Sequence, residues 1–174
     1  MTLDEQLNAA SLFGQTDKVK ELIDLGADVN MKDKNSDTPL NRACFMGYLD
    51  IIEILLGNRA DVNLYDKDGW ASLHSAGLNG HIKVVQALLE SGADIDIAND
   101  NGDTCLHLAA LRGYKAIVKL LLDRGADINV LNNSGKTPLR SAWKEDQLGI
   151  VDILLGRGAD VGGYTYVYYV LDGE

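Results

Sequence analysis

The chain has 174 residues, of which 46% are hydrophobic and 24% are charged, and this composition excludes a largely disordered protein. Its formal net charge of −10 argues against nonspecific binding to nucleic acid or to an anionic membrane, because both surfaces are negative. No segment approaches the roughly 20 apolar residues of a membrane-spanning helix, and residues 1–14 lack the pattern of a signal peptide. We therefore expect a cytoplasmic or nuclear protein.

A strict period runs through the whole chain. The tripeptide Ala-Asp-Val/Ile recurs every 33 residues, beginning at Ala27, Ala60, Ala93, Ala126 and Ala159. Leucine recurs at the same interval, at Leu7, Leu40, Leu73, Leu106 and Leu139. A unit of this length cannot bury its own apolar face, so the units are expected to stack and share one continuous core. The period predicts a repeat solenoid.

Each unit contains the signals of two helices and a polar loop. A threonine before an apolar run, twice followed by proline, marks the start of the first helix at Thr38, Thr104 and Thr137. Glycine ends that helix at Gly47, Gly80 and Gly113. Second helices are predicted at about 49–56, 82–89 and 116–122. Polar segments rich in Asn, Asp and Gly, such as 94–103, predict turn-dominated β-hairpins between units.

The segments Thr38-Pro39-Leu40, Thr104-Cys105-Leu106-His107-Leu108-Ala109 and Gly92-Ala93-Asp94 resemble the ankyrin repeat family. The resemblance implies an all-α repeat solenoid of stacked helix-turn-helix units joined by β-hairpin loops. It implies a single domain over residues 1–162, followed by a tyrosine-rich segment at 163–174. The expected units span about 1–32, 33–65, 66–98, 99–131 and 132–164.

Some positions depart from the repeat pattern. Arg59 stands in place of a helix-ending glycine, so either it adopts left-handed geometry at a cost of about 1 kcal/mol, or Asn58 or Gly57 ends the helix instead. Asp146 occupies another such position, where we expect a strained but intact turn. Ala71 replaces the capping threonine of the third unit, at a cost of about 1 kcal/mol.

The sequence contains no recognisable catalytic or metal-binding motif. The resemblance implies that His74 and His107, at equivalent repeat positions, make structural hydrogen bonds between units. Cys44 and Cys105 lie almost two repeats apart without nearby ligand partners, which indicates reduced, buried thiols. No phosphate-binding glycine loop is present. We expect no enzymatic activity, no catalytic residues, no metal and no cofactor.

The resemblance implies that another protein, of unknown identity, binds across the concave face and contacts the hairpin tips and the ends of the first helices. The candidate residues on those helices are Leu12, Phe13, Phe45, Met46, Leu78, Asn79, Leu111 and Arg112. Trp70 extends this stripe on a hairpin, and a polar rim surrounds it at Lys34, Asn35, Asp37, Lys67, Asp68, Asp100, Asn101, Asp103 and Lys136. In the alternative, the N-terminal segment covers Leu12 and Phe13, and Leu78 and Leu111 lie partly under neighbouring helices, leaving scattered exposed residues.

Residues 163–174 fall outside the repeat pattern, and their aromatic and β-branched side chains favour extended structure. We expect this segment to cap Trp143 and the last helix pair, in a monomer. The alternative is an adhesive strand that recruits a partner or a second copy. The expected function is non-catalytic protein binding; the alternatives are a structural or self-associating scaffold and an engineered binding scaffold.

Three asparagines form a further candidate site. Asn30, Asn63 and Asn129 resemble the asparagines that some ankyrin proteins present to a hydroxylating oxygenase. Their alternative role is hydrogen bonding within the hairpin turns.

Overall fold

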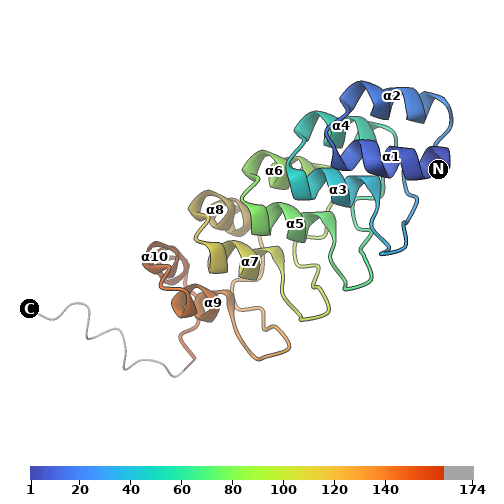
Figure 1. Cartoon of the computed structure of the whole chain (residues 1–174). Helices are drawn as coiled ribbons and strands as arrows, with labels where there is room; N and C mark the ends of the chain where they lie inside the picture. Colours follow the sequence, from blue (N-terminus) through green and yellow to red (C-terminus); the bar gives the residue numbers. More distant parts are fainter. Residues whose placement is uncertain (163–174) are drawn as a thin grey trace, which may run out of the picture.

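The computed structural model describes residues 1–162, and over that range the chain forms ten α-helices arranged as five successive pairs. The odd-numbered helices form one layer and the even-numbered helices form a second, with loops projecting from one side of the stack (Figure 1). The predicted all-α repeat solenoid is confirmed. The helices are α1 (Leu3–Leu12), α2 (Thr16–Asp24), α3 (Pro39–Met46), α4 (Leu49–Gly57), α5 (Ser72–Asn79), α6 (Ile82–Glu90), α7 (Cys105–Arg112), α8 (Lys115–Asp123), α9 (Pro138–Lys144) and α10 (Leu148–Gly156).

Helix ends follow the expected signals. The Oγ1 atom of Thr38 accepts a hydrogen bond of 3.1 Å from the backbone N–H of Asn41, which satisfies one free donor at the start of α3. Gly47 ends the same helix in the left-handed region, at φ 79°. Arg59 and Asp146 take this geometry themselves, at φ 67° and 52°. The first alternative for Arg59 is therefore the observed one.

The projecting loops are closed by backbone and side-chain hydrogen bonds together. In the second loop the backbone N–H of Asp66 donates to Trp70 O at 3.1 Å. In the same loop, Oδ1 of Asp66 accepts hydrogen bonds from the backbone N–H groups of Asp68 and Trp70, at 2.9 and 2.8 Å. These N–H groups are then not available for a β-ladder. Within residues 1–162 the expected hairpins contain no named strand and a single isolated bridge, between Tyr65 and Ala71.

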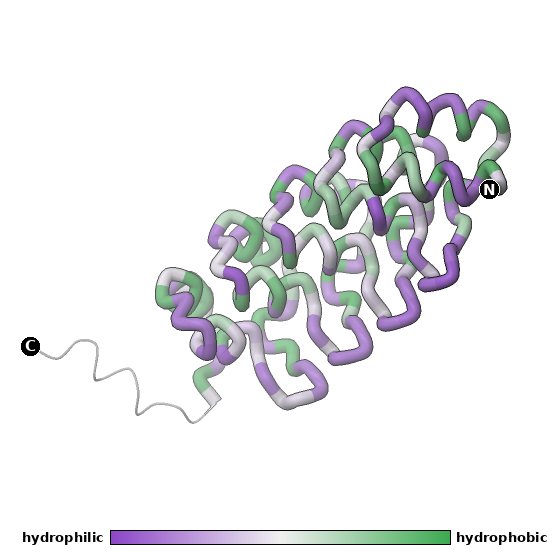
Figure 2. Tube along the Cα trace, in the orientation of Figure 1, coloured by the Kyte–Doolittle hydropathy of each residue, from purple (hydrophilic) through white to green (hydrophobic). Residues whose placement is uncertain are grey.

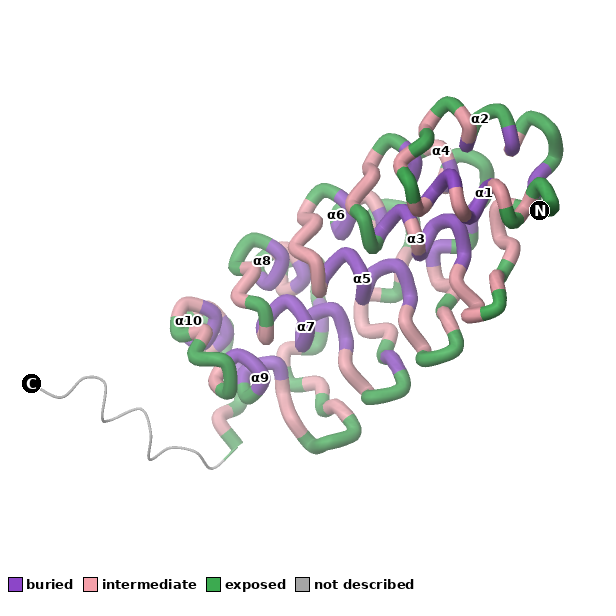
Figure 3. Tube along the Cα trace, viewed as in Figure 1, coloured by how far each residue is buried: buried purple, intermediate pink, exposed green. Residues whose placement is uncertain are grey.

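The core lies between the two helix layers. Buried residues dominate the odd-numbered helices α5 and α7 (Figure 3), and hydrophilic residues gather at the loop tips (Figure 2). Cys44 and Cys105 are free and buried, and burial raises the pKa of each thiol to about 12, so both are unreactive at neutral pH. None of the helices in residues 1–162 is long and apolar enough to cross a membrane.

A glycine seam joins consecutive repeats. A β-carbon added at Gly14, Gly47 or Gly80 would lie only 2.7–2.9 Å from a ring atom of the next repeat. These glycines therefore serve both the left-handed helix end and the close approach of the next unit. The seam pairs are Gly14 with Tyr48, Gly47 with His81, Gly80 with Tyr114 and Gly113 with Gln147.

Candidate functional site

A groove lies where the projecting loops meet the odd-numbered helices, on the side that we call the concave face. Its volume is about 410 Å³, and the first three repeats contribute to it. This concave groove brings together six of the predicted binding residues, namely Leu12, Asp37, Phe45, Asp68, Trp70 and Leu78. It is lined by Leu12, Asp37, Asn41, Arg42, Phe45, Asp66, Asp68, Trp70, Ser75 and Leu78.

The predicted apolar stripe is exposed in its first half and partly covered beyond it. Phe13 and Phe45 are 68% and 53% exposed, and Met46 is 41% exposed. In contrast, the leucines of the stripe are half-buried, as the alternative interpretation predicted; these are Leu12, Leu78 and Leu111. The same alternative was wrong for Phe13, which is not covered.

Trp70 is held in place within the groove. Its ring packs edge-to-face against His74, with a centroid separation of 5.8 Å and an interplanar angle of 65°. Its backbone N–H donates to Oδ1 of Asp66. The tryptophan therefore presents a fixed aromatic surface at the junction of loop and helix.

The second repeat places an ion-pair network at the edge of this groove. The Nη2 atom of Arg42 lies 2.6 Å from Asp33 Oδ2 and 3.0 Å from Asp37 Oδ2. Burial raises the pKa of Asp33, but hydrogen bonds from Arg42 and from two backbone N–H groups outweigh it and hold the pKa below the ordinary value. Burial raises the pKa of Asp37, and Arg42 does not cancel this effect because neighbouring carboxylates, including that of Asp66, add to it.

The other predicted residues do not gather in the groove. At the loop tips, the carbonyl of Asn35 accepts a hydrogen bond of 3.1 Å from Lys67 N–H, and that of Asn101 accepts one of 3.0 Å from Asn133 N–H. Asn79 donates its side-chain amide to its own helix, at Ser75 O. The predicted residues outside the groove lining are Phe13, Lys34, Asn35, Met46, Lys67, Asn79, Asp100, Asn101, Asp103, Leu111, Arg112 and Lys136.

Sequence reasoning missed four groove residues, namely Asn41, Arg42, Asp66 and Ser75. Arg42 carried a usable signal, because the equivalent positions of the other repeats hold small or apolar residues: Ala9, Ser75, Leu108 and Ser141. A lone charge at such a position, beside the acidic loop, indicates a local ion pair. Asp66 carried no comparable signal, because the same loop position is Asp or Asn in every repeat from the second onward.

Both buried histidines make hydrogen bonds to the backbone, and that of His107 to Lys136 O joins two units as expected, whereas that of His74 to Ile97 O stays within its own unit. The backbone N–H of Ala71 donates to Nδ1 of His74 at 3.0 Å, so the ring proton must lie on Nε2, which donates to Ile97 O at 2.9 Å. His107 repeats this arrangement with Thr104 N–H and Lys136 O. Desolvation by burial lowers the pKa of both histidines, even though the backbone acceptors favour the charged form. Their role here is structural.

The candidate modification sites connect adjacent repeats. Oδ1 of Asn30 accepts from Asp61 N–H at 2.7 Å, and that of Asn63 accepts from Asp94 N–H at 2.9 Å. Asn129 makes the equivalent contact to Asp160 N–H, at 2.8 Å. Hydroxylation of these asparagines stays a prediction, and an intact mass without added oxygen after coexpression with an asparaginyl hydroxylase would reject it.

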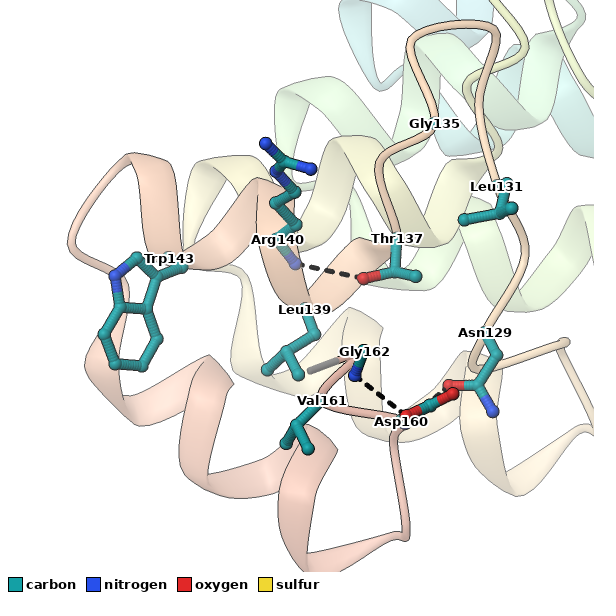
Figure 4. A pocket seen from close by; sticks show the side chains of 10 residues that line it. All are labelled: Asn129, Leu131, Gly135, Thr137, Leu139, Arg140, Trp143, Asp160, Val161 and Gly162. Carbon is teal, nitrogen blue, oxygen red and sulfur yellow. Dashed lines mark hydrogen bonds between the residues drawn. The ribbon is translucent and has the colours of Figure 1, made fainter. Parts of the chain in front are cut away.

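A second hollow, of about 520 Å³, opens at the C-terminal end of the stack. Figure 4 shows Leu139 of α9 and Val161 beside it, with Trp143 also on α9. Trp143 is half-buried and packs against the core, at the end where the sequence placed it. The expected tyrosine-rich cap at 163–174 lies outside the described residues. The hollow is lined by Asn129, Leu131, Gly135, Thr137, Leu139, Arg140, Trp143, Asp160, Val161 and Gly162.

Over residues 1–162, no group of three His, Cys, Asp or Glu side chains is arranged to hold a metal ion. No curated protein matches the sequence. A family model described as ankyrin repeats (3 copies) matches residues 7–99 and again 94–164, which together cover nearly the whole described stack. With its 33-residue period, paired helices and projecting loops, the chain belongs to the ankyrin repeat family.

Proposed function

We propose that the chain is a non-catalytic protein-binding module whose partner lies across the concave face. Ankyrin repeats generally mediate protein–protein interaction, and ankyrin domains are typically not enzymes. The observation that carries the proposal is the concave groove, where apolar and charged side chains from successive repeats share one surface. An aromatic centre with a polar rim is the usual anatomy of a protein interface.

The proposal can be tested by affinity capture from cell lysate with quantitative mass spectrometry. The triple variant Phe45→Ala/Met46→Ala/Trp70→Ala removes the aromatic and thioether surface of the concave face. A matched control, Leu25→Ala/Leu148→Ala, truncates side chains that are 58% and 51% exposed at the ends of α2 and α10, in the other helix layer. Circular dichroism and thermal unfolding must show that both variants remain folded.

We expect partner proteins that bind the wild type and the control but are lost from the triple variant. Equal retention by all three proteins, or a loss confined to the control, would reject the concave face. Purified candidate partners can then be compared by titration calorimetry with the same three proteins.

The hollow at the C-terminal end favours a second candidate function, which is self-association. Leu139, Val161 and the half-buried Trp143 line this hollow, and none of the described repeats lies beyond it. Sedimentation equilibrium can compare the full chain with a variant ending at Gly162. A dimer of the full chain that is lost on truncation supports self-association through residues 163–174, and a dimer that persists or appears on truncation supports self-association through the hollow. A monomer in both cases excludes self-association.

A further inference from the structure

Carboxylates outnumber cations in the concave groove. Asp37, Asp66 and Asp68 line it, and Arg42 is the one cation among the lining residues. Arg42 is already held between Asp33 and Asp37, at 2.6 and 3.0 Å. On the rim, Lys67 lies 3.8 Å from Asp68, but both side chains are more than half exposed, and such a pair contributes little. The groove therefore retains negative charge that its own cations do not neutralise.

The loop structure fixes this negative charge in space. Asp66 Oδ1 accepts from the N–H groups of Asp68 and Trp70, and Asp33 Oδ1 accepts from those of Asn35 and Asp37 at 2.8 and 3.1 Å. These turns hold the backbone on which the carboxylates stand. A cation that binds there meets acids that are already in position, which lowers the entropic cost of binding.

Apolar surface adjoins these acids. Phe45, Trp70 and Leu78 line the same groove, with Phe45 53% exposed. An aromatic face attracts a cation, and the aliphatic stem of arginine or lysine covers apolar surface while its charged head remains near an acid. The groove thus combines carboxylates with apolar surface, and the side chains of arginine and lysine match both.

Building on the proposed role of the concave face, we propose that the groove binds a basic segment of a partner protein in which arginine or lysine adjoins an apolar residue. The cation lies among Asp37, Asp66 and Asp68, and the apolar residue packs against Phe45 and Leu78. Trp70 forms the boundary between the two subsites.

The test uses the full-length chain and a library of displayed random peptides of about 12 residues, which extend to about 40 Å at most. We expect the selected peptides to be enriched in arginine or lysine next to leucine or an aromatic residue. Synthetic versions of these peptides are then titrated against variants, and against the wild type at increasing salt concentration. Salt should weaken their binding, because it screens the attraction of charges near the surface.

The diagnostic variant is Asp66→Asn/Asp68→Asn. Asparagine already occupies the equivalent loop positions in this chain, at Asn99 and Asn101, where Asn99 Oδ1 accepts the same turn hydrogen bonds. The variant therefore removes charge while preserving the turn. We expect its affinity for the peptides to fall about tenfold or more, while the control Asp17→Asn/Asp152→Asn, on exposed positions of α2 and α10, stays within about twofold of the wild type.

The outcomes separate this proposal from the broader one. Selected peptides without basic residues, or unchanged affinity of the Asp66→Asn/Asp68→Asn variant, would overturn the partner chemistry. If the Phe45→Ala/Trp70→Ala variant still binds those peptides more weakly than the wild type does, the concave face remains the binding site. If no groove variant lowers the affinity for the peptides, both proposals fail for these ligands. A library that yields no enrichment would overturn the binding of a linear segment, and the lysate capture would then decide the role of the concave face independently.

Discussion

The backbone N–H of Asp61 donates a hydrogen bond of 2.7 Å to Oδ1 of Asn30, in the preceding repeat. The Nδ2 atom of Asn30 donates in turn to Arg59 O at 3.2 Å, so one side chain holds two backbone groups of the next unit. Asn63 makes the same pair of contacts. In the third repeat the position is Asp96, whose carboxylate accepts from Asp127 N–H at 3.1 Å but has no N–H to donate in return.

Replacing Asp96 with asparagine is expected to stabilise the stack. The amide retains the acceptor for Asp127 N–H and adds a donor toward the next repeat, and a hydrogen bond of this kind contributes about 0.5–1.5 kcal/mol. Urea unfolding of Asp96→Asn at neutral pH measures the gain. The reciprocal change Asn63→Asp should destabilise the chain, and a loss of stability in Asp96→Asn would contradict this account.

This gain should depend on pH. Burial raises the pKa of Asp96 above 3.8, only partly offset by the Asp127 N–H, so the wild type loses stability as the pH rises from 3.8 through the folded-state pKa. Below that window the carboxyl group is protonated in both the folded and unfolded states. The advantage of Asp96→Asn should therefore be largest at neutral pH and shrink as the pH falls toward 3.8. A gain that does not change with pH would show that charge plays no part.

The buried histidines should make the fold sensitive to mild acid. Desolvation lowers the pKa of His74 and His107 below 6.5, so the unfolded chain binds more protons as the pH falls below that value. The contribution of the neutral histidines to the free energy of unfolding is fully present above pH 6.5. It falls below that pH, by up to about 1.4 kcal/mol per pH unit for each histidine. Unfolding free energies between neutral and mildly acidic pH test this, with His107→Gln as the comparison. The variant should be less stable at neutral pH, and its stability should depend less steeply on pH.

Arg59→Gly should stabilise the second repeat. Arg59 adopts φ 67°, whereas the equivalent positions of the other repeats hold glycine, and a left-handed non-glycine residue costs about 1 kcal/mol. Part of this gain is offset because glycine makes the unfolded chain more flexible. Differential scanning calorimetry should show a higher unfolding temperature. The matched change Gly92→Arg introduces the same strain at φ 87° and should lower that temperature.

Gly47→Ala should cost more stability than Gly26→Ala. Both glycines have positive φ, at 79° and 91°, so each substitution meets backbone strain of about 1–2 kcal/mol. At Gly26 nothing lies within 4 Å of the added methyl group, but at Gly47 the His81 ring lies 2.7 Å away. Displacing that ring adds an overpacking cost of about 1–3 kcal/mol. Equal losses of unfolding free energy in the two variants, measured by chemical denaturation, would show that the His81 ring moves away from the added methyl group at no cost.

Deletion of residues 163–174 tests whether this segment caps the terminal hollow. We expect a lower unfolding temperature, because about 1 kcal/mol shifts it by roughly 2–4 °C in a chain of this size. Trp143 lines the hollow and should become more exposed. Its fluorescence can be followed alone after Trp70→Phe, since the chain has two tryptophans. An unchanged unfolding temperature and emission maximum would reject the cap.

Much of this fold could be predicted from the sequence, because the residues that begin and end the helices recur at the same positions in successive repeats. Thr38 and Gly47 mark the ends of α3 through local geometry alone, which a reader of the sequence can recognise. The loops between units are dominated by turns, as their polar composition predicted, because the Asp66 carboxylate accepts hydrogen bonds from loop N–H groups. Their backbone pairing is limited to short contacts, such as Asp66 N–H with Trp70 O.

The candidate site was less predictable, because it depends on departures from the repeat. Phe45 and Trp70 could be placed on one face from their repeat positions, and the structure brings both to the groove. The extent to which Leu78 is covered depends on packing between units, which the period does not encode. The lone charge of Arg42 indicated a local ion pair, but the sequence did not identify Asp33 as its partner, because several acids lie in the preceding loop.

Because the glycine seam recurs between repeats, the number of repeats in the stack can change. Three of the four junctions place a ring against the seam glycine, and three of the four use an asparagine side chain between the loops, so most junctions use the same kinds of contact. Excision of residues 66–98 would bring Tyr114 onto Gly47 and Asp127 onto Asn63, which are contacts of types the chain already makes elsewhere. Whole units can thus be lost or duplicated without new interface chemistry, while the surface that a partner meets is lengthened, shortened or reordered.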